Sequence, residues 1–283
     1  ETIRGCVFMS ENNAYNEVEV LYNNLCSIVS ETFTDEQNDT IRRAYKLAEK
    51  AHEGQLRKSG QPYIIHPLSV AIILAQMGMD AASLAAALLH DVVEDTEVTK
   101  EDITKSFGEE IATLVDGVTK LGKVSLSNKE EQQAENVRKM LIAMSHDIRV
   151  IIIKLADRLH NMQTLDIKER QTQLKIAKET LDIHVALAER LCMNSLKHTL
   201  EDLCFKYLLP DEYVEISTYL NEYYKRSQNI IADIRGDLQK IATENGVDAK
   251  IQSRVKSTFG VYKKTLTKSK EKIYDIIAHR IIV

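Results

Sequence analysis

The stretch DAASLAAALLHDVVEDT, residues 80–96, decides the fold. Asp80 is a favourable N-cap for a helix, and the Ala and Leu residues after it give a helix that is apolar on nearly every side. A helix of that kind is buried, because other elements must cover it all round. We therefore expect a central helix that runs into an adjacent histidine and aspartate, His90 and Asp91.

The flanking sequence predicts further helices around this one. Only ten glycines and three prolines interrupt 283 residues. Thr34 to Gln37 fits a capping box, Thr99 starts a short helix that closes at Gly108, and His66-Pro67 opens a helix with proline at its preferred first position. Further helices are expected over 109–120, 128–146, 150–165, from about 168 to 207, and from Pro210 to about 245. The fold class is therefore mainly α.

Composition divides the chain into four parts. Residues 1–30 form an accessory segment, 31–200 the main helical domain, 201–246 connecting helices, and 247–283 the beginning of an α/β domain. The last part is basic and ends in IIAHRIIV (276–283), a run rich in β-branched residues that is typical of a strand. No partner strand follows that run, so we expect this domain to be cut short.

Charge and hydropathy exclude some classes of protein. The net charge is −5 and the pI is about 6.0, which argues against direct binding to DNA. No apolar run approaches the roughly 18 residues of a membrane span, and no signal peptide is evident. The four cysteines show no CxxC spacing, which is typical of reduced thiols in a cytoplasmic protein.

Two histidines and two aspartates form a candidate metal site: His66, His90, Asp91 and Asp157. A carboxylate beside an apolar helix is costly when buried alone, so it should be paired or bound to a metal. Mixed nitrogen and oxygen ligands without thiolates argue against structural zinc and suit Mn²⁺ or Fe²⁺, with Zn²⁺ as an alternative. The competing interpretation is that the histidines are hydrogen-bonded core residues and the aspartates ion-pair partners.

Glu94 and Asp95 follow Asp91 by three and four residues. If one more helical turn follows the histidine and aspartate, both carboxylates lie near the metal ligands. Carboxylates there could orient the attacking water or accept its proton. The alternative is a solvated helix end.

A polar stripe and a basic loop supply candidate substrate contacts. Lys154, Asp157, Asn161 and Thr164 share one face of a helix that is otherwise apolar, and that face either lines a pocket or meets solvent. Asn161 can both donate to and accept from a nucleobase edge, and Lys154 is either a phosphate contact or an ion-pair partner. The loop Arg57-Lys58-Ser59-Gly60 could hold phosphate or stack on a base, although such loops are more often simply solvated.

Together these residues resemble the hydrolase half of the bifunctional Rel (RelA/SpoT homologue) family. The resemblance covers most of residues 40–215. Its stretches are AHEGQLRKSGQPYIIHPLSVA (51–71), AAALLHDVVEDT (85–96), FGEEIATLVDGVTKLGKV (107–124), EEQQAENVRKML (130–141), DIRVIIIKLADRLHNMQTL (147–165) and LEDLCFKYLLPDEY (200–213).

The resemblance implies an HD-domain helical bundle with one Mn²⁺ held by His66, His90, Asp91 and Asp157. It implies that Glu94 and Asp95 serve the hydrolytic water. It also implies a nucleotide held by Arg57, Lys58, Ser59, Asn161 and Thr164, and release of pyrophosphate from the 3′ position of (p)ppGpp. Lys154 is expected to stabilise the leaving pyrophosphate. Two competing functions are an HD phosphohydrolase acting on another nucleotide and a sensory nucleotide-binding module.

The end of the chain resembles the start of the family's synthetase domain, in SRVKSTFGVYKK (253–264) and KIYDIIAHRIIV (272–283). Arg254, Lys256 and Lys263 match positions that face ATP, but the family's catalytic carboxylates come later, so we expect no synthesis. The resemblance implies coupling to a synthetase domain within the same chain, with ribosome or regulator contacts only through other regions. The chain departs from the family pattern at Gln163, where an arginine is usual, and at 188–193.

Overall fold

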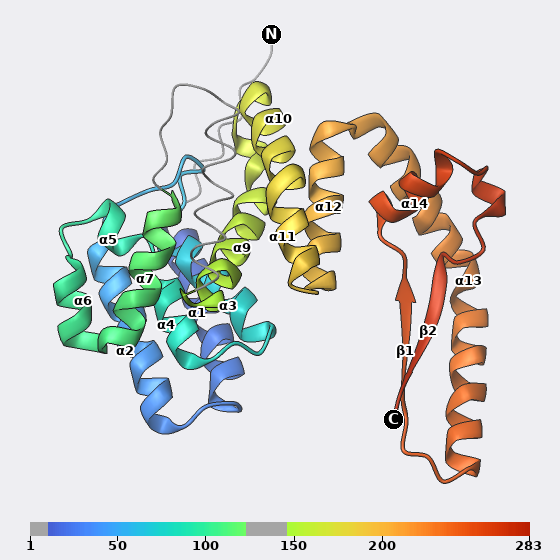
Figure 1. Ribbon diagram of the computed structural model, residues 1–283, viewed down its shortest axis with the longest axis horizontal. Helices are drawn as coiled ribbons and strands as arrows, with labels where there is room; N and C mark the ends of the chain where they lie inside the picture. The colour runs from blue at the N-terminus through green and yellow to red at the C-terminus, as the bar shows by residue number, and fades with distance from the viewer. Residues whose placement is uncertain (1–10, 123–145) are drawn as a thin grey trace. The chain divides into compact units, whose positions relative to one another are not determined.

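The computed structural model describes residues 11–122 and 146–283 (Figure 1). The helix expected over 128–146, all but its last residue, and the stretch 130–141 lie outside them. Two compact units divide the chain, one ending at Ile167 and one spanning Lys168–Val283. The mainly α class is confirmed. None of the described helices combines the length and apolar character needed to cross a membrane.

The first unit is helical throughout its described part. Its elements are α1 (Glu11–Ser30), α2 (Asp35–Ala51), α3 (Ile65–Gln76), α4 (Ala81–Leu89), α5 (Val92–Asp95), α6 (Lys100–Phe107), α7 (Glu109–Gly122), α9 (Ile148–Gln163) and the short 3-10 turn η1 (Leu165–Ile167). The predicted caps are present: Thr34 and Thr99 form capping boxes, and the Asp80 carboxylate accepts from the Ser83 amide at 2.7 Å.

Helix α4 is the centre of this unit, as its sequence predicts. Nearly all of its residues are buried, and it packs against α2, α3, α7 and α9. The regular helix ends at Leu89, so His90 is its C-cap. Asp91 is then the N-cap of α5, and the Asp95 amide donates to the Asp91 carbonyl at 2.8 Å. The turn that carries Glu94 and Asp95 is therefore present, but as a separate short helix.

Helices α7 and α9 meet closely at Gly117. A Cβ atom added there would lie 2.8 Å from Cγ2 of Val150, which is itself buried. Atoms in a packed core do not approach that closely, so glycine at this position is required by the approach of α9. The metal ligand candidate Asp157 lies two turns further along α9.

The second unit begins with helices and ends in a small sheet. Its elements are α10 (Arg170–Glu179), a π-helical stretch η2 (Thr180–His184), α11 (Val185–Arg190), α12 (Asn194–Leu208), α13 (Pro210–Glu244), β1 (Lys250–Val255), α14 (Thr258–Thr265), a 3-10 turn η3 (Lys270–Lys272) and β2 (Ile277–Ile282). Proline begins α13, where its missing N–H costs nothing.

The final strand does have a partner, which corrects the expectation from the sequence. Strand β2 pairs antiparallel with β1, with Lys250 opposite Ile282 and Val255 opposite Ile277, and both strands run beside α13 (Figure 1). The partner precedes the strand instead of following it. Strand β1 was not predicted because its sequence, KIQSRV, is mostly polar and only Ile251 is buried.

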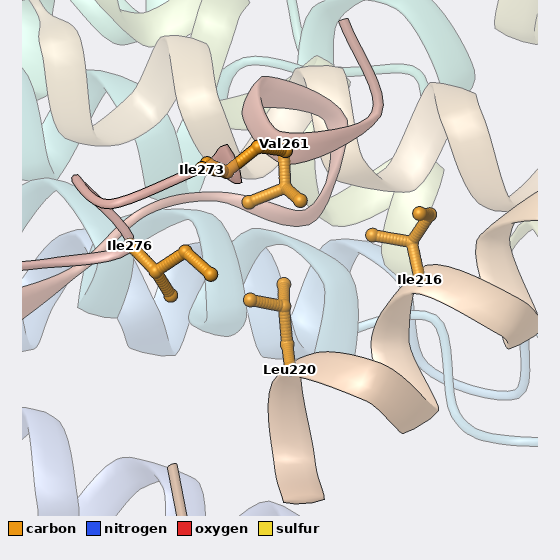
Figure 2. Close-up of a cluster of buried hydrophobic side chains, with 5 residues drawn as sticks. All are labelled: Ile216, Leu220, Val261, Ile273 and Ile276. Carbon is orange, nitrogen blue, oxygen red and sulfur yellow. The ribbon is translucent and has the colours of Figure 1, made fainter. Parts of the chain in front are cut away.

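A hydrophobic cluster joins α13 to the segment after β1. Figure 2 shows its five buried side chains, Ile216 and Leu220 from α13 with Val261, Ile273 and Ile276. Helix α12 also holds the start of α14.

Two carboxylates of α12 bind the start of α14. The Asp202 carboxylate accepts from the amides of Thr258 and Phe259 at 3.2 and 2.7 Å. Buried Glu201 pairs with Lys263 at 3.0 Å. The connecting helices and the start of the α/β segment are thus packed as one body.

Candidate metal centre

Three helices bring the predicted metal ligands together. His66 lies in the first turn of α3, His90 caps the end of α4, and Asp157 lies in the middle of α9. All three are almost completely buried, and each offers a ligand atom within 4.8 Å of the others.

Asp91 adds a fourth group to this cluster. One of its oxygens, Oδ2, lies 3.7 Å from His66 Nε2, and the other, Oδ1, lies 3.1 Å from His90 Nε2. His66 Nε2 is also 3.2 Å from Asp157 Oδ1. The four residues singled out from the sequence therefore converge on one point, two imidazoles facing two carboxylates.

The hydrogen bonding of His90 fits a bound cation. Its Nδ1 lies 2.7 Å from the carbonyl oxygen of Ala87, which can only accept, so Nδ1 carries the proton. In the neutral ring Nε2 then presents a lone pair. Nε2 is buried without a hydrogen-bond partner, yet it faces a carboxylate oxygen of Asp91. A lone pair directed at a carboxylate oxygen is the arrangement in which the two groups can hold one divalent cation between them.

Asp157 is held as a carboxylate by its neighbours. Its Oδ2 is 2.6 Å from Lys154 Nζ, and its Oδ1 accepts from Asn161 Nδ2 at 2.6 Å. Burial alone would raise the pKa of Asp157, but the Lys154 ammonium beside it holds that pKa well below its ordinary value. Three residues of the polar stripe of α9 thus face the candidate metal centre: Asp157 as a candidate ligand, with Lys154 and Asn161 bonded to its carboxylate.

Tyr63 links the metal centre to Asp95. Its hydroxyl lies 2.8 Å from Asp91 Oδ2 and 2.9 Å from Asp95 Oδ2. Burial, together with Asp91, raises the pKa of Tyr63 well above its ordinary value, so the hydroxyl stays a donor. Asp95 is therefore tied to a metal ligand through one side chain. Glu94 is exposed on the same short helix.

The basic loop reaches the cluster through Arg57. Its Nη2 donates to Asn161 Oδ1 at 3.1 Å, and its Nη1 lies 3.4 Å from Nδ1 of His160. Lys58 and Ser59 are exposed, and Ser59 bonds to Gln61 within the loop.

Two other residues at the end of α9 complete this edge of the centre. The Thr164 hydroxyl donates to the His160 carbonyl oxygen at 3.2 Å, so it is used within its own helix. Gln163 is exposed.

Two residues near the centre were not singled out from the sequence, His160 and Tyr63. His160 stands three residues after Asp157, so the helical period places both on one face, and this was a usable signal. Tyr63 lies in an irregular loop three residues before His66. No periodicity applies there, so only the folded loop reveals its contacts.

A buried group of two histidines and an aspartate on a helical bundle defines a protein with an HD-type candidate metal site. The model of the HD domain family matches residues 44–194, more than half of the chain, and the chain belongs to that family. Within it, the chain is the HD domain region of a RelA/SpoT family member.

Several bacterial relatives are similar over most of this chain. A GTP pyrophosphokinase from Myxococcus xanthus is 47% identical over 90% of the chain and 34% of the relative. A guanosine-3′,5′-bis(diphosphate) 3′-pyrophosphohydrolase from Vibrio cholerae is 44% identical over 93% and 38%. A GTP pyrophosphokinase from Streptomyces coelicolor is 47% identical over 86% and 29%. The chain thus spans about a third of the length of these relatives.

Proposed function

We propose that this chain hydrolyses (p)ppGpp at the ribose 3′ position, giving GDP or GTP and pyrophosphate, with Mn²⁺ as the metal. The observation that carries the proposal is the convergence of two buried imidazoles, buried Asp157 and half-buried Asp91, with His90 Nε2 3.1 Å from Asp91 Oδ1. The substrate comes from the similarity to the pyrophosphohydrolase of Vibrio cholerae. We assign the reaction to the cytoplasm.

In this proposal His66, His90, Asp91 and Asp157 hold the metal. When bound, a divalent cation polarises a phosphoryl oxygen and lowers the pKa of water. Asp95 is the better placed general base, because Tyr63 fixes its carboxylate beside Asp91. It accepts the proton of the water that attacks the phosphorus bonded to the ribose 3′ oxygen. That oxygen is the leaving group and takes up a proton from solvent, which gives GDP or GTP and pyrophosphate, while Glu94 orients the water.

The substrate contacts follow from exposure and charge. Lys58 and Ser59 are exposed and face solvent, so they are available to phosphate. Arg57 donates a hydrogen bond to Asn161, and this pair can hold the guanine base. Thr164 lies at the end of α9, the helix that carries Asn161. Lys154 keeps its positive charge beside Asp157, because that carboxylate offsets the effect of burial and raises the lysine pKa. We assign it to the negative charge of the pyrophosphate group that is attacked and released.

We infer that the α/β part of this chain, residues 247–283, is coupled to the connecting helices. The contacts of Glu201 and Asp202 with the start of α14 support a coupling between the connecting helices and that part.

Incubation with ppGpp and Mn²⁺, with and without a chelator, tests the function when the nucleotide products are resolved. The proposal expects GDP and pyrophosphate only when metal is present. Release of monophosphate would instead indicate a different phosphohydrolase. Intact ppGpp bound to folded, metal-loaded protein would indicate a sensory module.

A further inference from the structure

The buried contact between His66 and His160 requires a shared proton. Their Nδ1 atoms lie 2.7 Å apart, and both rings are almost fully buried. Two lone pairs cannot approach to that distance, and neither can two N–H groups, so one nitrogen donates and the other accepts.

Arg57 decides which ring holds the proton. Its Nη1 lies 3.4 Å from the same Nδ1 of His160, and a guanidinium can only donate. His160 Nδ1 must therefore present its lone pair, and the proton lies on His66 Nδ1. A metal held at His66 Nε2, which lies 3.2 Å from Asp157 Oδ1 and 3.7 Å from Asp91 Oδ2, requires that the proton of the neutral ring be on Nδ1. This is the form of a metal-binding imidazole.

We propose that His160 is a positioning residue of the metal centre: its Nδ1 accepts the Nδ1–H of His66 and so fixes the ring and the tautomer in which Nε2 binds the metal. The inference rests on the proposed metal dependence but on no particular substrate. Histidine ligands commonly donate their second N–H to a carboxylate, carbonyl or water, and here a second histidine takes that place.

Arg57 extends the same arrangement to the substrate loop. Through His160 it reaches His66, and through Asn161 it reaches Asp157, because Asn161 donates to Asp157 Oδ1. One side chain of the loop is therefore bonded to the partners of two metal ligands.

A matched pair of substitutions tests the role of His160. Leucine and asparagine have nearly the same shape, but only asparagine carries an acceptor, Oδ1, close to the position of the histidine Nδ1. We expect His160→Leu to weaken Mn²⁺ binding about 10- to 100-fold, as is typical when the partner of a metal ligand is lost. We expect His160→Asn to bind Mn²⁺ nearly as tightly as the unsubstituted chain. Titration calorimetry of the 283-residue chain measures both without any substrate.

The Mn²⁺ affinities of the two variants decide whether the acceptor on His160 is required. Unchanged Mn²⁺ affinity in His160→Leu would overturn the proposal, because the acceptor would then be dispensable. An equal loss of affinity in both variants would also overturn it, because the histidine ring and not its acceptor would then matter. A second measurement covers the case in which a variant fails to fold. Nitrogen-15 NMR of the unsubstituted chain should show a proton on His66 Nδ1 and none on His160 Nδ1, and the reverse arrangement would refute the inference. Neither measurement depends on ppGpp turnover, so the proposed hydrolysis can fail while this inference holds.

Discussion

Replacing Tyr63 with phenylalanine removes one oxygen atom from the candidate metal centre. That oxygen lies within hydrogen-bond distance of both Asp91 and Asp95, at 2.8 and 2.9 Å. The aromatic ring, which stacks on His52 with centroids 4.5 Å apart, stays in place. The change therefore tests hydrogen bonding with little effect on packing.

The expected magnitude follows from the single proton of the hydroxyl. It can donate to only one carboxylate at a time, and a hydrogen bond to a charged group is worth about 1.5–3 kcal/mol. If that bond fixes Asp95 as the general base, its loss lowers kcat/KM by about 10- to 150-fold, since about 1.4 kcal/mol corresponds to a factor of ten. If it orients Asp91 instead, the loss falls mainly on Mn²⁺ affinity.

Initial rates of ppGpp hydrolysis at saturating Mn²⁺, together with a Mn²⁺ titration, separate these two effects. Tyr45→Phe is the matched control, because the Tyr45 hydroxyl bonds to Glu49 within α2, which supplies none of the candidate ligands. Wild-type hydrolysis and wild-type Mn²⁺ affinity in Tyr63→Phe would refute the assigned role of Tyr63.

Three further outcomes are expected. Asp95→Asn should lower kcat by about 10²- to 10⁴-fold, the usual contribution of a positioned base, and should keep Mn²⁺ binding in calorimetry. Gly117→Ala should lower the free energy of unfolding by about 1–3 kcal/mol in urea denaturation, because the new methyl group overlaps Val150. Arg149 lowers the pKa of Asp147, so this pair should stabilise the fold above the ordinary aspartate pKa of 3.8 and lose that effect as pH falls through the lowered value. Arg149→Met should flatten the acid side of the stability profile.

Each outcome has a control or a contrary result. His90→Ala should lose both Mn²⁺ binding and turnover, in contrast to Asp95→Asn, and full turnover in Asp95→Asn would make the assignment of the base wrong. Gly236→Ala, in an exposed turn of α13 where a Cβ meets nothing within 4 Å, should instead stabilise the chain by up to about 1 kcal/mol. If the free energy of unfolding depends on acidic pH in the same way with and without Arg149, the pair of Arg149 and Asp147 does not contribute to that dependence.

The helical core could be predicted because its signals are local. The apolar run of α4, the cap at Asp80 and the capping boxes at Thr34 and Thr99 each specify an element without reference to the rest of the chain. The convergence of the metal ligand candidates was also foreseeable, since an isolated carboxylate in an apolar helix such as α9 requires a partner.

The contacts that the sequence did not reveal are those made between distant segments. His160 gains its significance from His66, 94 residues earlier, and Tyr63 from Asp91 and Asp95. Strand β1 escaped prediction for a related reason: four of its six residues are polar, and pairing with β2 and packing against α13 make it a strand. The local sequence pattern indicates the helix or strand propensity of a segment. The contacts of His160 and Tyr63 and the formation of β1 depend instead on segments that are distant in the sequence.

The cluster of Ile216, Leu220, Val261, Ile273 and Ile276 sets where the polypeptide can be divided. The composition changes after Gly246, but a cut there would leave the apolar face of α13 without its cover and remove the partners of Glu201 and Asp202. Cleavage or recombination at this junction would therefore expose the apolar face of α13 and destabilise both segments. Any excision of α13 would therefore have to remove the α/β segment with it, because each covers the apolar face of the other.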